Sequence, residues 1–169
     1  MLVAFSVGKW VQETCDELYE LIAERSQQPT YYNKISLCSD GNEQNENAIP
    51  KYFNKDCVNY GQVIKDKEQQ KVIGSHKRRV LGNMSYDEIS IAHVDGLCKA
   101  LRERVKCFVR EASTYPKKRS AVGNFLSIYQ TYNNLIKAKK KQTPCMKEGI
   151  TSYVWSWGKL LNVKISSRK

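Results

Sequence analysis

Apolar and polar positions alternate along the chain with periods that predict a succession of strands and helices. Residues 1–7 carry Val3, Phe5 and Val7 among small residues, which is typical of a strand. Between residues 11 and 25, apolar positions recur at helical spacing with acidic residues between them. An amphipathic helix is therefore expected there, followed by a short strand over residues 34–39.

The middle of the chain carries a weaker pattern. Residues 43–53 are expected to form a second helix, although Pro50 favours a break or a late start in it. Residues 57–64 have the composition of another strand. Residues 65–88 are charged and contain several turn-forming residues, so a loop with at most one short strand is expected around the basic cluster at 77–79.

Two longer helices are predicted in the second half, each from one apolar stripe at helical spacing. Together with the preceding strands, these helices indicate an α/β protein with additional helices. The first stripe consists of Val94, Leu97, Leu101, Val105 and Phe108, and the second of Val122, Phe125, Leu126, Tyr129, Asn133 and Ile136.

Charge is distributed unevenly along the sequence. Residues 1–64 have a net charge of −4, residues 65–116 of +4, and residues 117–169 of +11, with twelve basic groups and one acid. A basic third of this kind favours a polyanionic partner, usually nucleic acid. A solvated, lysine-rich surface explains the same composition without any partner.

Apolar runs are short throughout the chain. The longest, residues 2–5, is far below the roughly 20 residues that a membrane-spanning helix needs. No basic region precedes it, so it is a poor secretory signal. We therefore expect a soluble, cytoplasmic protein with no membrane partner.

Two acidic residues are candidates for chemistry. Asp40 follows the strand predicted at 34–39 and precedes Gly41, which lets the backbone turn sharply. An acid at a strand end of an α/β sheet points toward the usual ligand crevice, although an Asp-Gly turn without chemistry is the favoured interpretation from spacing alone. Asp95 lies in the first turn of a predicted helix, where an acid ordinarily interacts with the helix dipole.

Four stretches also occur in an order that a known family shares. Residues 37–41 (LCSDG) are similar to a strand end T-T-D-G, and residues 94–102 (VDGLCKALR) align without gaps with V-E-R-x-N-L-T-x-R. Residues 108–110 correspond to F-T-R, and residues 143–155 to T-P-A-M-A-A-G-V-T-x-x-V-W. The chain thus resembles the insertion-sequence transposases with an acidic D-D-E triad.

Over about residues 7–155, this resemblance implies a truncated ribonuclease-H-like α/β sheet flanked by helices, with a helical C-terminal part. Asp40 stands at the family's second catalytic Asp and Asp95 at its catalytic Glu, so both are the implied ligands of Mg²⁺ or Mn²⁺. The family's first Asp has no counterpart, because no acid precedes Glu13. Residues 1–169 are therefore expected to form one partial catalytic domain without its first strands and without an N-terminal DNA-binding domain.

The function that the resemblance implies is DNA transposition, with DNA ends and target DNA as partners. Lys99, Arg102 and Arg110 are candidate phosphate contacts, and a solvated helix face explains them equally well. The family's first Asp is absent, and its Glu is replaced by the shorter Asp95. We therefore expect an incomplete or inactive copy of a transposase. The alternative function is a non-catalytic, basic nucleic-acid-binding protein. The loss of inner strands from a truncated sheet would expose sheet edges, which favours self-association.

Overall fold

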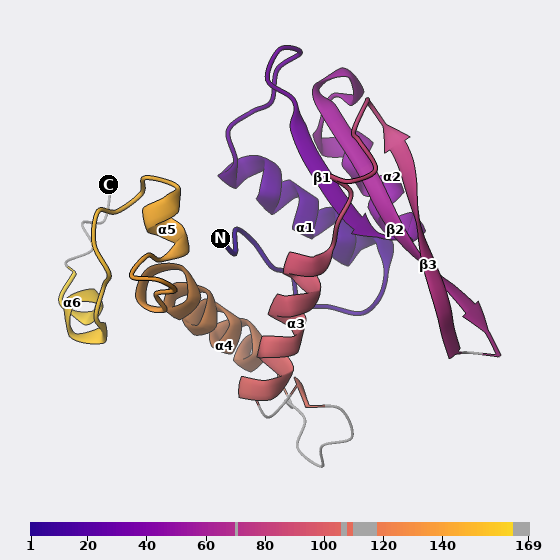
Figure 1. The fold of residues 1–169 in the computed structure, drawn as a ribbon. Helices are drawn as coiled ribbons and strands as arrows, with labels where there is room; N and C mark the ends of the chain where they lie inside the picture. Colours follow the sequence, from indigo (N-terminus) through magenta and orange to yellow (C-terminus); the bar gives the residue numbers. More distant parts are fainter. Residues whose placement is uncertain (70, 106–107, 110–117, 164–169) are drawn as a thin grey trace. The chain divides into compact units, whose positions relative to one another are not determined.

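The computed structural model of the chain describes every residue except 70, 106–107, 110–117 and 164–169. The described residues form a mixed α/β protein with a three-stranded sheet and six α-helices (Figure 1). The chain divides into two compact units, one of Ser6–Lys117 and the other of Met1–Phe5 with Lys118–Lys169. The α/β class predicted from the order of strands and helices is confirmed.

The sheet lies in the first of these units and has the strand order β1-β2-β3. Strand β1 (Ile35–Asp40) pairs in parallel with β2 (Val58–Glu68), and β2 pairs antiparallel with β3 (Lys71–Leu81). Parallel neighbours need a crossover connection, and here helix α2 (Glu43–Tyr52) provides it, followed by a short 3₁₀ helix, η1 (Lys55–Cys57). The strands predicted at 34–39 and 57–64 are confirmed.

Helix α2 continues through Pro50, so the break expected at that residue does not occur. The proline stands in the last turn, and the helix ends two residues later at Tyr52. At that position a proline removes one backbone hydrogen bond close to the helix end and leaves the preceding turns intact. The helix predicted over residues 43–53 is confirmed.

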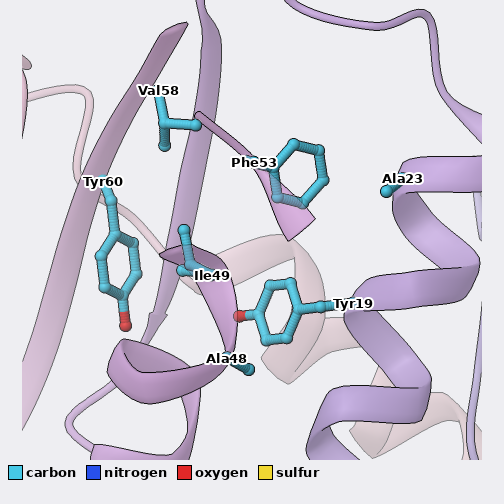
Figure 2. Packing of buried hydrophobic residues seen from close by; sticks show 7 residues of the cluster. All are labelled: Tyr19, Ala23, Ala48, Ile49, Phe53, Val58 and Tyr60. Carbon is cyan, nitrogen blue, oxygen red and sulfur yellow. The ribbon is translucent and has the colours of Figure 1, made fainter. Parts of the chain in front are cut away.

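The hydrophobic core lies between the sheet and the helices on one of its faces. Helix α1 (Gln12–Arg25) confirms the amphipathic pattern of residues 11–25. Its buried side chains meet those of α2 and of the central strand β2 in one cluster (Figure 2). Its members are Tyr19, Ala23, Ala48, Ile49, Phe53, Val58 and Tyr60.

The loop of residues 82–91 covers part of the opposite face of the sheet. Ile89 and Met84 are buried, and the thiol of Cys38 on β1 contacts the sulfur of Met84. Ile89 lies so close to β2 that a Cβ added to Gly61 would be 2.5 Å from its Cγ1 atom. A glycine in the central strand therefore lets this loop pack directly on the backbone.

Strand β3 corrects the loop expected over residues 65–88. It extends over eleven residues, and every side chain from Lys71 to Arg79 is exposed. A strand that is exposed on both faces has no alternation of apolar and polar residues, which is the pattern by which strands are recognised in a sequence. The backbone pairing with β2 establishes it instead.

Helix α3 (Ala92–Arg104) ends before Phe108, which was expected to lie on its apolar stripe. None of its described residues is buried, and Val94 is 56% exposed. The periodicity therefore identified the helix but overestimated both its length and the burial of its stripe.

The second unit is helical in its described residues. Helix α4 (Arg119–Thr131) buries Val122, Leu126 and Tyr129 of its predicted apolar stripe, but Phe125 of the same stripe is 56% exposed. A π-helical turn, η3 (Tyr132–Ile136), follows it directly, and Asn134 is the residue that is buried there. The short helices α5 (Pro144–Lys147) and α6 (Trp157–Leu161) complete the described part of this unit.

Residues 1–7 do not form the strand that their composition predicts. The backbone N–H of Leu2 donates to the side-chain oxygen of Asn134, and the amide of Asn134 donates back to the carbonyl of Leu2. The side chain of Gln130 also donates to the carbonyls of Leu2 and Val3. Side-chain amides thus satisfy backbone groups that a neighbouring strand would otherwise pair.

Within the part of the chain that the structure describes, no helix has both the length and the apolar character that crossing a membrane requires.

The contact between Gly61 and Ile89 gives a stability prediction. Gly61→Ala should lower the free energy of unfolding by about 1–3 kcal/mol, because a methyl group there overlaps the buried Ile89 side chain. In an Ile89→Ala background the same change should cost less, because the overlapping atoms are gone. Urea denaturation of the two single variants and the double variant measures this coupling.

Gly74→Ala on β3 is the matched control. A Cβ there meets only a carboxylate oxygen of Asp66, at 3.5 Å, so the cost should remain below that of Gly61→Ala. Equal costs at the two glycines, or the same cost of Gly61→Ala in both backgrounds, would show that Ile89 does not pack on β2.

Candidate functional site

Asp40 is the last residue of β1, and its exposed side chain lies where the chain turns into α2. One carboxylate oxygen of Asp40 accepts a hydrogen bond of 3.0 Å from the side-chain amide of Asn45 in the first turns of α2. Asn42 caps the same helix, because its side-chain oxygen accepts from the backbone N–H of Gln44 at 3.1 Å. Local capping and the Asp40–Asn45 bond together fix the turn that carries the acid.

Asn45 connects Asp40 with helix α1. Its side-chain oxygen accepts hydrogen bonds from the hydroxyl of Tyr19 at 3.2 Å and from the thiol of Cys15 at 3.4 Å. Burial raises the pKa of both groups above their usual values, which keeps them protonated as donors at neutral pH. With both acceptor contacts made by donors from α1, the amide of Asn45 is oriented with its N–H toward Asp40.

A second chain of hydrogen bonds reaches Asp40 from the centre of the sheet. The buried side chain of Gln62 donates to the hydroxyl of Tyr60 at 2.7 Å, and that hydroxyl lies 2.7 Å from Ser39. Because Gln62 donates, the Tyr60 proton is free to point to Ser39, which in turn donates to the carbonyl of Asp40 at 2.7 Å. Burial raises the pKa of Tyr60 although these two partners lower it, so the hydroxyl stays neutral.

An arginine from the edge strand completes this side of the sheet. Arg78 donates to the side-chain oxygen of Gln62 through Nε at 3.2 Å and Nη2 at 2.6 Å, and it forms an ion pair with Glu46 of α2. Arg78 and Glu46 lie beside a cavity of about 480 Å³, which Gly41, Glu43, Asn47 and Ile64 also line. The pocket thus opens next to the turn that carries Asp40.

Gly41 has a different role from the sharp turn expected of it. Among the described glycines, positive φ angles occur at Gly82 and Gly149 and not at Gly41. A Cβ at Gly41 would lie 2.9 Å from Cγ1 of Ile64 on β2. The glycine is needed because the two segments approach closely, not because the backbone is left-handed.

The other candidate residues lie on α3. Asp95 is exposed in the first turn of that helix, as expected of an acid that interacts with the helix dipole. Its spacing to Lys99 and Arg102 puts all three on one helix face, and both basic residues are exposed. The ammonium nitrogen of Lys99 lies 3.9 Å from a carboxylate oxygen of Glu103, one helical turn further along. Arg110 lies outside the described residues.

The metal ions that the resemblance implies can be compared with the donors present. Mg²⁺ and Mn²⁺ prefer oxygen ligands, and a two-metal centre needs several carboxylates to hold both ions. Over the described ranges of the chain, no three His, Cys, Asp or Glu side chains gather into a group that could hold a metal ion. Asp40 makes its described contact with an amide, not with a second acid. These residues do not fit a two-metal centre, so no metal-dependent step follows from them.

The sequence alone identified Asp40 at the strand end but none of the polar residues that surround it. Asn45, Gln62 and Arg78 act through partners on other elements, and no local spacing indicates such partners. One signal was present: Gln62 is a polar residue within an otherwise mostly apolar strand segment, and a buried polar side chain requires hydrogen-bond partners.

No protein-family model, curated protein or solved structure matches the chain.

Asn45 can be tested as the link between the acid and helix α1. Asn45→Ala should lower the free energy of unfolding by about 1–3 kcal/mol, because it leaves the buried Tyr19 hydroxyl without its acceptor. Chemical denaturation measures the difference. Asn47→Ala is the matched control, since Asn47 is exposed on the same helix and gains the same helix propensity. A cost at Asn47 as large as that at Asn45 would contradict the assigned role.

Proposed function

We propose that this chain is a transposase-related DNA-binding protein that does not cleave DNA by itself. The observation that carries the proposal is the position of Asp40, at the carboxyl end of β1 in a parallel β1-α2-β2 unit and next to a polar pocket. In α/β sheets, ligands bind in the crevice outside the carboxyl ends of the strands. The resemblance places a catalytic acid of the transposases at this residue.

The order of elements supports a ribonuclease-H-like arrangement. Helix α2 connects two parallel strands, and the later helix α3 carries Asp95 in its first turn, at the position of the family's third acid. In this proposal the three strands correspond to part of the ribonuclease-H-like sheet, and Asp40 and Asp95 mark the side on which the DNA backbone lies.

Duplex DNA is the partner that the charge favours. Residues 117–169 carry a net charge of +11, and Lys99 and Arg102 share an exposed helix face with Asp95. Lysine and arginine side chains bind phosphates and release condensed counterions, so affinity should fall steeply with salt and depend little on sequence.

The proposed lack of cleavage is supported by the set of metal-binding side chains around Asp40. An in-line displacement at a phosphodiester requires carboxylates that hold metal ions on both the attacking and the leaving oxygen. Asp40 is bound to an amide, and the described residues supply no group of three metal-binding side chains. In this proposal the chain therefore retains DNA binding without cleavage.

The position of Asp40 gives a direct binding test. Asp40→Asn should raise the affinity for a duplex in EDTA about threefold, because a carboxylate ~6 Å from a phosphate costs about 0.7 kcal/mol in water. Fluorescence anisotropy at fixed salt measures this change. Asp56→Asn is the control, because Asp56 is an exposed acid in η1 with the same charge.

The same duplex, incubated with Mn²⁺, should show binding without nicks. An affinity unchanged by Asp40→Asn, or raised equally by Asp56→Asn, would remove Asp40 from the DNA site. Nicking that Asp40→Ala abolishes would overturn the proposed lack of cleavage. A wild-type chain that fails to bind duplex at low salt would refute the function as a whole.

A further inference from the structure

The hairpin of β2 and β3 extends beyond the rest of the sheet. Strand β1 pairs with β2 only as far as Val63, whereas the pairing of β2 with β3 continues to Glu68 and Lys71. Residues 64–69 and 71–76 therefore form a two-stranded ribbon, which runs to the lower right in Figure 1. An isolated hairpin is only marginally stable, so binding of a partner would stabilise an exposed ribbon of this kind.

Strand alternation sorts the charges of this hairpin onto two different faces. Arg78, opposite Gln62, points to the side of α2 and is paired with Glu46, and His76 on the same face is paired with Asp66. The opposite face is different. Its paired positions are Gly61 with Arg79, Val63 with Lys77, and Lys65 with Ser75.

This second face, which we call the basic face, consists of Lys65, Lys77 and Arg79. No acid is paired with them between β2 and β3, and Asp40 of β1 lies beside Val63 in the same row as Lys77. None of the ion pairs within the described part of the chain involves these three residues. All three are exposed. Their charges are thus available to an external anion.

Tyr86 holds two of the three cations in place. The ammonium of Lys77 donates to the backbone carbonyl of Tyr86 at 2.6 Å, and the guanidinium of Arg79 lies 4.8 Å from the centre of the Tyr86 ring. The loop of residues 82–91 that carries Tyr86 is itself anchored on the sheet by Met84 and Ile89. Cations fixed in this way lose less conformational entropy when they bind.

We propose that the basic face binds the backbone of duplex DNA, with the ribbon of residues 64–69 and 71–76 lying in the major groove. This inference rests on the proposed function and names the surface that performs it. The major groove, about 12 Å wide, admits a two-stranded β-ribbon. Near the turn of the ribbon, Val72 and Ile73 are 58% and 66% exposed, and apolar side chains of this kind contact thymine methyl groups. An acidic polypeptide would match the charge but not this apolar tip.

The experiment compares two triple variants of the full chain that lose the same charge. The basic-face variant combines Lys65→Gln, Lys77→Gln and Arg79→Gln. The control variant combines Lys9→Gln, Lys34→Gln and Lys55→Gln, which replace three exposed lysines elsewhere in the same unit. Affinity for a 20-bp duplex is measured over a salt series. The basic-face variant should bind the duplex at least about tenfold more weakly than the wild-type chain. The slope of log affinity against log salt concentration should become shallower by about two to three, since each phosphate contact contributes about 0.9.

A footprint on the wild-type chain gives an answer that does not depend on the folding of the variants. Duplex DNA should protect Lys65 and Lys77 from acetylation, as read by mass spectrometry, and leave Lys9, Lys34 and Lys55 reactive. Two outcomes would refute DNA binding by the basic face while leaving the proposed function intact. In the first, the wild-type chain binds duplex and both triple variants lose the same affinity. In the second, bound duplex does not protect Lys65 and Lys77 from acetylation. If the basic-face variant loses as much affinity for poly-L-glutamate as for duplex DNA, the basic face binds acidic polypeptides, and the proposal of DNA binding by this face is also refuted.

Discussion

Burial of Gln62 at the centre of the sheet is the constraint on which the other features depend. The side chain is fully buried, so both its amide and its carbonyl need partners inside the protein. Tyr60 accepts from the amide, and Arg78 of β3 donates twice to the carbonyl. A shift of β3 by one residue would turn Arg78 to the opposite face and leave that carbonyl unpaired, at a cost of about 1–3 kcal/mol.

This single register determines the surfaces on both sides of the sheet. On the side of α2, Gln62 begins the hydrogen-bond chain through Tyr60 and Ser39 to the backbone of Asp40. On the opposite side, alternation places Lys77 and Arg79 together without an acidic partner. In the proposed function, the buried amide of Gln62 thus supports the backbone at Asp40 on one side of the sheet and fixes the position of the basic face on the other.

The sequence predicted those elements whose pattern reflects burial on one face. Helix α1 and strand β1 have such patterns, and the end of β1 placed Asp40 correctly. The sequence predicted at most one short strand where the eleven-residue β3 lies, because exposure on both faces leaves no alternation. Residues 1–7 were wrongly assigned because side chains of α4 and η3 satisfy part of their backbone. Asn45 and Gln62 owe their roles to tertiary partners 26 and 16 residues away, which no local pattern encodes.

A double-mutant cycle on Gln62 and Arg78 tests this account most directly. Gln62→Ala, Arg78→Ala and the double variant are compared by urea denaturation, with Lys77→Ala in place of Arg78→Ala as the reference cycle. We expect a coupling free energy of about 1–3 kcal/mol between Gln62 and Arg78 and near additivity between Gln62 and Lys77. Additivity in the first cycle to within about 0.5 kcal/mol would contradict the register on which both surfaces depend.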